Sequence, residues 1–284
     1  MRRNNPLILS AMAAGLLCAM AGGVMAAEHR PSVHPGAAAS APLELVKDPR
    51  ALAALKGMSD RLAAATAFTV RTRNSVPMVG PNGQWISLIG TSSLALQRPD
   101  KLFVERAGDQ VPLDVYYDGR NVTLYAPAEK LYAEIPAPAT IDAALNAAFD
   151  VAEHSFPYVE VLLADPYAAM SANLLGALYV GESTVAGVKT EHLALASPGV
   201  DWEIWIGAED KLPRLVQARH VDVEKVPTVT TEFYDWALNP TIPAARFAFA
   251  APPDAERIER LRLHAPGAGQ GATGAKHGKS VGQE

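Results

Sequence analysis

Three side chains that could serve acid–base chemistry or bind a metal ion lie together in the middle of the sequence. Glu153 and His154 follow Asp150 by three and four residues, a spacing that places all three on one face of a helix. Two or three such groups can hold a metal ion or act as a general base. The segment also has the character of a solvated helix end, and we expect that structural role for it.

The other histidines give weaker indications of chemistry. His192 and His220 fall within expected strands, where the sequence shows no obvious partner for either ring, and we expect them to be structural or surface residues. The sequence contains no His-Glu-x-x-His pair and no phosphate-binding loop of the P-loop type. We therefore expect no enzyme activity, no catalytic residue, no metal site and no cofactor.

Composition excludes several further classes of function. The chain has 284 residues, of which 49% are hydrophobic and 19% are charged, and its formal net charge is -5. A mildly acidic chain has no basic surface for nucleic acid, so we expect no nucleic-acid partner. Cys18 is the single cysteine, which rules out an intramolecular disulfide and a thiolate cluster for zinc or iron–sulfur.

The N-terminus has the three parts of a secretory signal peptide. Arg2 and Arg3 are the positive region, residues 7–20 form the apolar stretch, and residues 24–26 provide a small-x-small cleavage site. The apolar stretch is too short for a membrane span, so we expect none in the mature chain. We predict Sec-dependent export to the periplasm and cleavage after Ala26.

The rest of the chain divides by composition into a linker, one folded domain and a tail. Residues 27–42 are rich in Pro, Ala and Ser and have no apolar period, which is typical of a linker. Residues 264–284 are rich in Gly and Ala and cannot bury a core. After a signal peptide over residues 1–26, we therefore expect one domain over residues 43–263.

The domain begins with a helix and continues with two runs of strands separated by further helices. Asp48 and Pro49 are the cap and first position of the first helix; Thr140 and Asp165 cap two more, the second of which ends at Gly176. Strands are expected at 68–73, 84–97, 102–106, 113–117, 121–125, 131–135, 178–182, 190–196, 201–206, 214–223 and 228–235, with a short edge strand at 246–250. Because successive strands follow one another without intervening helices, the sequence predicts an α+β fold: one curved antiparallel sheet whose concave face is covered by helices.

Large apolar side chains in these strands suggest a pocket. Trp202, Ile204 and Ile206 share one face of their strand, while Glu203 and Trp205 point to the other. The covering helices carry mostly alanines, which would fill a concave sheet incompletely and leave an apolar cavity. The residues that we predict to bind its ligand are Trp85, Leu94, Leu96, Phe103, Tyr117, Leu124, Trp202, Ile204, Ile206, Phe233 and Trp236, together with Arg73 and Arg98.

Several motifs give the chain a resemblance to a known family. RPDKLFVER, YYDGRNVTLYAPAEKLYAEIP and VDWEIWI, in this order between Asp48 and Ile258, resemble an uncharacterised bacterial family of predicted periplasmic proteins. That family looks like part of the LolA/LolB superfamily of lipoprotein carriers. The resemblance implies a half-barrel sheet closed by a helical lid, an apolar cavity for acyl chains, and an arginine that holds the lid closed. Arg73 and Arg98 are the candidates for that arginine.

Three functions remain open from the sequence. The first is a periplasmic carrier or binding protein for an apolar ligand, which would be an acyl chain, a lipid or a lipoprotein, and this is the function that we expect. The second is an envelope sensor or protein-interaction module of the same fold, with an envelope protein as its partner and no ligand transport. The third is a hydrolase that uses Asp150, Glu153 and His154.

Overall fold

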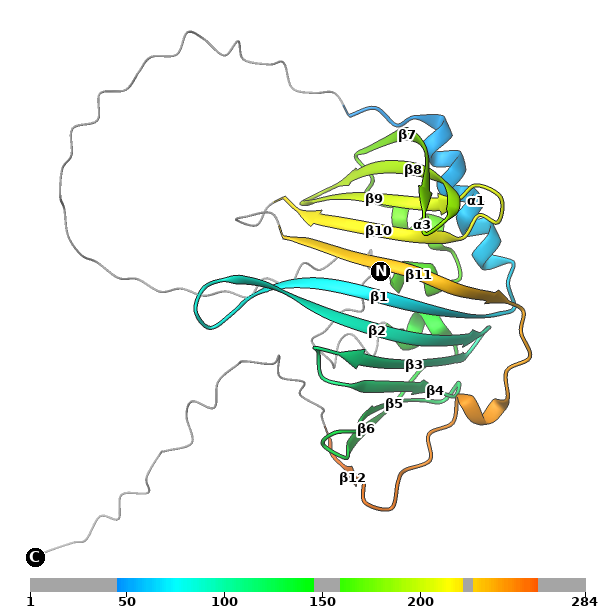
Figure 1. Ribbon diagram of the computed structural model, residues 1–284. Coiled ribbons are helices and arrows are strands. Elements are labelled where there is room, and N and C mark those ends of the chain that lie inside the picture. The colour runs from blue at the N-terminus through cyan, green and yellow to red at the C-terminus, as the bar shows by residue number, and fades with distance from the viewer. Residues whose placement is uncertain (1–44, 146–158, 222–226, 260–284) are drawn as a thin grey trace, which may run out of the picture.

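The computed structural model describes residues 45–145, 159–221 and 227–259, all of them within the expected domain (Figure 1). Within these residues, twelve strands form one sheet with the order β12-β6-β5-β4-β3-β2-β1-β11-β10-β9-β8-β7. The strands are β1 (Ala67–Val79), β2 (Trp85–Gln97), β3 (Lys101–Gly108), β4 (Leu113–Tyr117), β5 (Asn121–Ala126), β6 (Leu131–Pro136), β7 (Gly176–Val185), β8 (Val188–Ser197), β9 (Val200–Gly207), β10 (Pro213–His220), β11 (Thr228–Leu238) and β12 (Glu256–Arg257).

The sheet consists of two antiparallel meanders joined at its centre. β1 to β6 form one meander and β7 to β11 the other, and β1 pairs with β11 to connect them. The sheet does not close, because β12 and β7 are its two edges. The predicted α+β fold with one large, open, curved sheet is therefore confirmed.

The C-terminal part of the sheet differs from the prediction. The edge strand is β12, which pairs with β6 in parallel, and the expected strand at 246–250 is absent. Pro243 begins a 3-10 turn, η2 (Ala244–Arg246), in its place, and the amide of Arg246 donates to the carbonyl of Pro243 at 2.9 Å. This turn bends the backbone at the position where the expected strand would begin.

Helix α1 (Pro49–Ala63) covers the half of the sheet that contains β7 to β10. The Asp48 side chain accepts a hydrogen bond from the amide of Arg50 at 2.8 Å, which confirms the predicted cap. Leu55, Met58 and Leu62 of the helix are completely buried in the main core, together with Ile204 and Ile206 of β9. This half of the inner face is therefore filled by side chains of the protein itself.

Two short helical elements follow β6 and pack on the same face. They are η1 (Val159–Leu162) and α3 (Pro166–Ser171), and the amide of Tyr167 donates to Ser59 Oγ of α1 at 2.9 Å. Asp165 caps α3 as predicted, accepting from the amide of Ala168 at 2.9 Å. The helix ends at Ser171, before the predicted stop at Gly176, because Gly176 already pairs with β8.

We call the face that carries α1, η1 and α3 the inner face and the opposite one the outer face. On the outer face, Ala95, Phe103 and Phe247 form a small second core. The chain between β11 and β12 supplies Phe247 to this core, passes η2 at the lower right of Figure 1, and then runs to the β6 edge at the bottom of the picture. No helix among the described residues has the length and apolar character needed to cross a membrane.

Candidate functional site

A pocket lies on the inner face beneath η1, in the half of the sheet that α1 leaves uncovered. Val70 of β1, Leu94 of β2, Val104 of β3, Val115 of β4 and Val122 of β5 contribute to its floor. Each strand of this meander places alternate residues on the inner face, so five successive strands supply an apolar surface. Phe233 of β11 forms the wall towards the filled half of the sheet.

The opposite wall comes from two segments that we call the covering segments, residues 141–145 and η1. Ala144, Leu145, Val159, Val161 and Leu162 of these segments face the pocket. Thr140 begins the first segment as predicted, because its hydroxyl accepts from the amide of Ala143 at 3.2 Å. The two segments are linked by Asp142, whose carboxylate accepts from the amide of Ala164 at 3.1 Å.

The pocket is nearly closed in this conformation. Its empty space totals ≈ 750 Å³ when the volume open to solvent is included, but its cavity volume is only ≈ 50 Å³. A cavity of that size holds a few water molecules, whereas sites for small organic ligands usually enclose about 300–1,000 Å³. An acyl chain would therefore enter only after the covering segments move away from the sheet.

Arg98 forms hydrogen bonds at the end of η1. It follows β2, and its guanidinium donates to the carbonyl oxygens of Leu163 at 2.9 Å and Leu162 at 3.4 Å. Burial lowers the pKa of Arg98, and the nearby carboxylate of Asp142 opposes that effect. Of the two arginines predicted as candidates for a lid contact, Arg98 is thus the one that contacts a covering segment. Arg73 is exposed on the outer face of β1.

Tyr117 connects the pocket floor to the start of the covering segments. Its ring lines the pocket, and its hydroxyl donates to the carbonyl oxygen of Pro138 at 2.5 Å. Burial is the main cause that raises the pKa of this tyrosine. The neutral phenol therefore remains the donor and fixes the loop that precedes residue 141.

The predicted ligand-binding residues fall into several groups. Leu94, Tyr117 and Phe233 line the pocket. Five others are buried in the main core without lining the pocket: Leu96, Leu124, Trp202, Ile204 and Ile206. Trp85 is 38% exposed at the tip of the β1–β2 hairpin, which projects beyond the sheet at the left of Figure 1.

Phe103 lies on the outer face, in contrast to its predicted place in the pocket. It packs against Phe247 and Tyr116, and the guanidinium of Arg246 lies 3.9 Å from its ring centroid. Its neighbours Leu102 and Val104 line the pocket, so the alternation of the strand places Phe103 on the opposite side. The expectation of an inner aromatic at this position was therefore wrong.

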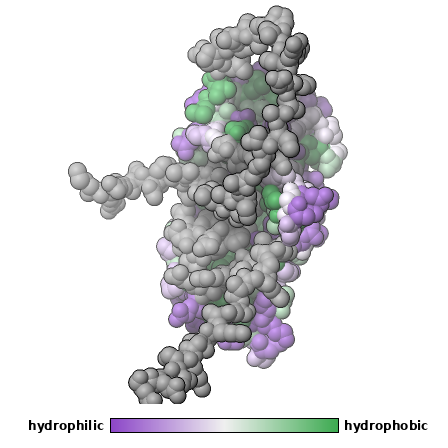
Figure 2. Space-filling model, turned by 90° about the vertical axis from the view of Figure 1, so that its left-hand side faces the viewer, coloured by the Kyte–Doolittle hydropathy of each residue, from purple (hydrophilic) through white to green (hydrophobic). Residues whose placement is uncertain are grey.

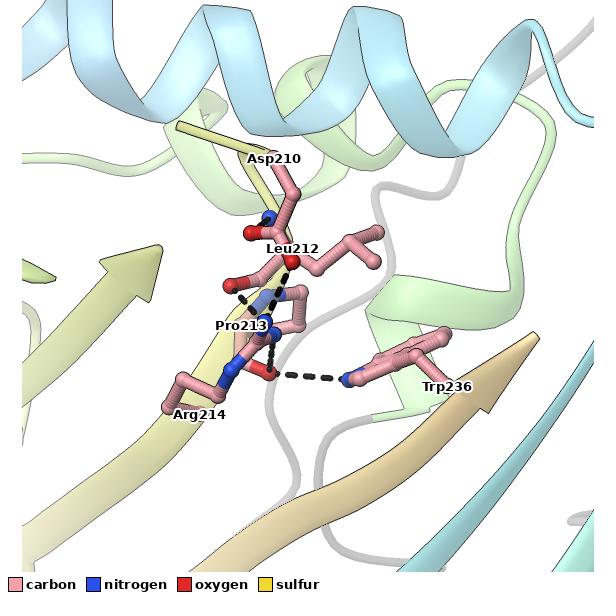
Figure 3. Close-up of polar contacts among 5 residues, drawn as sticks. All are labelled: Asp210, Leu212, Pro213, Arg214 and Trp236. Carbon is pink, nitrogen blue, oxygen red and sulfur yellow. Dashed lines mark hydrogen bonds and ion pairs between the residues drawn. The ribbon is translucent and has the colours of Figure 1, made fainter. Parts of the chain in front are cut away.

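Trp236 supports the pocket wall from within the core. Its ring packs against Phe68 and Phe233 with centroid separations of 5.5 and 6.0 Å, and its indole N–H donates to the carbonyl of Pro213 at 3.0 Å. Figure 3 shows that this carbonyl lies at the start of β10, beneath α1, and Pro213 is the first residue of that strand. Arg214 donates to the carbonyls of Leu212 at 3.2 Å and Pro213 at 3.4 Å and pairs with Asp210, which fixes the same turn.

Several pocket residues lie outside the predicted set, although the sequence carries a clear signal for them. In β1, Val70, Thr72 and Asn74 line the pocket, while Arg71 and Arg73 between them are exposed on the outer face. Strict alternation of arginines with smaller residues indicates a half-buried strand and assigns each residue to a face. The prediction considered the arginines and overlooked the residues between them.

The candidates for catalysis receive no support from the described residues. Asp150, Glu153 and His154 lie outside the residues that the structure describes. Within those residues, no group of three or more His, Cys, Asp or Glu side chains could hold a metal ion. His192 does have a partner: its ring stacks on Trp205 at 4.1 Å between centroids, and Nε2 lies 2.8 Å from the Glu203 carboxylate.

The described residues therefore form an open sheet with a covered pocket of uncharged side chains on its inner face. The chain belongs to the family described as "Predicted periplasmic protein (DUF2092)", whose model matches residues 51–261. This confirms the predicted family of periplasmic proteins. The family description also agrees with the location expected from the N-terminus.

Several solved structures are similar to this chain. The lipoprotein LppX from Mycobacterium tuberculosis is 12% identical, with a TM-score of 0.40 and coverage of 70% of this chain and 100% of that chain. The complex of MucA and MucB from Pseudomonas aeruginosa has 13% identity, a TM-score of 0.42 and coverage of 74% and 63%. A LolA superfamily protein from Nitrosomonas europaea has 8% identity, a TM-score of 0.33 and coverage of 70% and 97%. No curated protein matches the sequence.

Proposed function

We propose that this protein is a periplasmic carrier or binding protein that holds an apolar ligand in the pocket between β1–β5 and the covering segments. The ligand class is an acyl chain, carried as a free lipid or as part of a lipoprotein. The main support is the pocket itself, whose described lining consists mainly of Val, Leu, Ala and aromatic side chains, with a few uncharged polar ones and no charged side chain. Burial of apolar area, at about 25 cal/mol per Å², would provide the affinity.

In this proposal, Arg98 controls entry to the pocket. The closed cavity of ≈ 50 Å³ is too small for an acyl chain, so binding requires displacement of η1. The hydrogen bonds from Arg98 to Leu162 and Leu163 oppose that displacement. Ligand binding and breakage of these two hydrogen bonds are therefore coupled.

The test is native mass spectrometry of the full chain expressed with its N-terminal signal and purified from the periplasm without detergent. A carrier retains a bound mass of a few hundred daltons or more, which organic extraction releases as a lipid. The extracted protein then rebinds that lipid in solution. If the purified protein carries no apolar mass, and the extracted protein binds no acyl lipid or lipopeptide, the proposal is wrong.

One observation favours the alternative of a protein-interaction module. β7 is an edge strand of the sheet: Ala177 pairs with residues 46–48, and beyond it no other described strand borders this edge. Leu178 and Val180 on β7 are 58% and 50% exposed. Figure 2 views the molecule from the end where the β1–β2 hairpin projects and shows hydrophobic surface between hydrophilic residues. An exposed apolar edge can pair with a strand of another protein. In the same mass spectrum, a stoichiometric protein adduct without any lipid would support this alternative.

A further inference from the structure

One end of the pocket differs chemically from the rest. Four hydrogen-bonding side chains lie there on the inner face, and we call them the polar end: Thr72 and Asn74 of β1, Ser92 of β2 and Thr231 of β11. Strand pairing places Thr231 opposite Asn74 and Thr72 opposite Ser92, so the four residues form one continuous patch. Asn74 lies furthest along β1 towards the projecting hairpin, and Val70 lies at the apolar end.

Two acceptor atoms of the polar end are buried without a partner among the described residues. They are Oδ1 of Asn74 and Oγ1 of Thr231, whose residues are only 9% and 1% exposed. A buried polar atom with no hydrogen bond is costly and uncommon in folded proteins. Asn74 also lines the pocket, so its amide oxygen is available to a molecule bound there.

The strand next to Asn74 leaves this amide uncovered. Its direct neighbour on β2 is Gly90, which has no side chain to fill the space or to form a hydrogen bond. A Cβ added to Gly90 would make only ordinary contacts, at 3.5 Å from the carbonyl oxygen of Ala107. Packing of the strands therefore does not require glycine here, and the missing side chain leaves Oδ1 of Asn74 without a cross-strand partner on β2.

The lining side chains at the polar end are uncharged, which favours an uncharged ligand head. Thr72, Asn74 and Ser92 are the lining residues at this end, and none of them carries a charge. Arg106, which faces Ser92 in the register of β2 and β3, donates to the carbonyl oxygen of Val111 at 3.1 Å. Burial also lowers the pKa of Arg106, which reflects the cost of a charge at this depth.

From this geometry we infer that the polar end binds the uncharged head of an amphipathic lipid. A hydroxyl or amide N–H of the head donates to Oδ1 of Asn74, and Thr231 Oγ1 forms a second hydrogen bond. The acyl chain lies along Val70, Leu94 and Leu102. This inference rests on the proposed function and specifies its ligand class as a neutral lipid with a hydrogen-bond donor, either a glyceride or a fatty amide.

The test compares four ligands that share one oleoyl chain and differ only in their heads. Monoolein carries hydroxyl donors, oleamide carries an N–H donor, methyl oleate carries no donor, and oleate carries a negative charge. Each competes with a fluorescent acyl ester for the delipidated full-length protein. We expect monoolein or oleamide to bind about tenfold more tightly than methyl oleate. The tighter of the two identifies the head as a glyceride or an amide.

Substitutions at the polar end then test whether these residues cause the preference for a donor head. Asn74→Leu and Thr231→Val remove the two acceptors while keeping similar volumes, and both should reduce the preference for the donor head to less than about threefold. Thr230→Val is the matched control, because Thr230 is the neighbour of Thr231 on the outer face of β11. The ratio between two ligands is the readout, so a general loss of affinity does not affect it.

The outcomes separate this inference from the proposed function. Equal binding of methyl oleate and the two donor lipids by the wild type overturns the inference, and so does tightest binding of oleate. Retention of the full preference by both Asn74→Leu and Thr231→Val overturns it as well. If the wild type binds none of the four lipids, the proposed function fails together with the inference.

Discussion

The guanidinium of Arg98 meets η1 at its end, where the last carbonyl groups of a helix have no partner within the helix. It donates to two of these oxygens, at residues 162 and 163. A charged donor at this place forms the hydrogen bonds that the carbonyls lack. Its positive charge is also attracted to the negative end of the short helix. One side chain therefore connects the segment after β2 to carbonyl groups 64 and 65 residues later in the chain.

Replacement of Arg98 by methionine tests this role. We expect Arg98→Met to raise amide hydrogen exchange over residues 159–164 by at least about tenfold, to accelerate ligand release, and to lower the free energy of unfolding by about 1–3 kcal/mol. Arg73→Met is the matched control, because Arg73 is exposed on the outer face. Equal effects of the two substitutions on exchange in this segment would exclude the proposed contact as a latch.

Glu160 should make the stability of the covering segments depend on pH. Burial is the largest cause that raises the pKa of this carboxyl, and a hydrogen bond from its own backbone partly opposes it. The folded state therefore favours the protonated form of Glu160. The stability that this preference contributes is fully present below the pKa that Glu160 has in the unfolded chain, and it is lost as the pH rises through the pKa of Glu160 in the folded protein. Glu160→Gln should raise Tm at pH 7 and have little effect near about pH 4.

Thermal unfolding followed by circular dichroism at both pH values measures this effect. The exposed Glu182 of β7 provides the control, and Glu182→Gln should leave Tm nearly unchanged at both. A lower Tm for Glu160→Gln at pH 7 would show that the ionised carboxylate stabilises the fold.

At the scale of elements, the helix caps and most strands could be predicted from the sequence, because their signals are local. Asp48 and Asp165 each precede a proline and each cap a helix. The end of β1 could not be predicted in this way, because Pro77 argues against a strand. The structure accommodates Pro77 because pairing of β1 with β11 ends at Ser75, so that β2 is the one described strand that borders Pro77.

The chain between β11 and β12 is a second element whose role depends on contacts distant in sequence. Phe247 is 1% exposed and packs on the outer face against Phe103. We expect Phe247→Ala to lower the free energy of unfolding by about 3–5 kcal/mol, measured by urea denaturation. The partly exposed Phe249, which packs against Tyr116, serves as the comparison, and Phe249→Ala should cost less.

If Phe247→Ala retains its ligand affinity at low denaturant concentration, packing of the outer core does not affect ligand binding in the pocket. A selective loss of ligand affinity without loss of stability would contradict the assignment of Phe247 to a structural core.

At the scale of the whole molecule, the predicted architecture is correct. Several residues that were predicted to border the cavity lie instead in the half of the inner face that α1 covers. The aromatic and branched residues of β9 were expected to border a cavity, yet Leu55, Met58 and Leu62 of α1 fill the space above them. Alanine content alone could not show this, because the buried side of α1 also carries the large apolar residues Leu55, Met58 and Leu62. Which strands a helix covers is decided by long-range packing, and no local pattern reports it.

Ligand binding should be visible in the stability of the whole domain. A ligand that binds only the folded state at 100 times its Kd adds about 2.7 kcal/mol to the free energy of unfolding. We therefore expect delipidated protein to melt at a lower temperature than protein as purified, and added lipid to restore the higher value. Scanning calorimetry of the two preparations measures the difference, and identical melting curves would contradict a bound ligand.

The two ends of the described domain lie at opposite edges of the sheet. Lys47 bridges to Ala177 of β7, whereas the amide of Ile258 donates to Tyr132 of β6 at the other edge (Figure 1). Fluorophores attached just outside these two points would span the full width of the sheet. Any flattening or tightening of its curvature as cargo enters would then register as a change in energy transfer, without a label near the binding site.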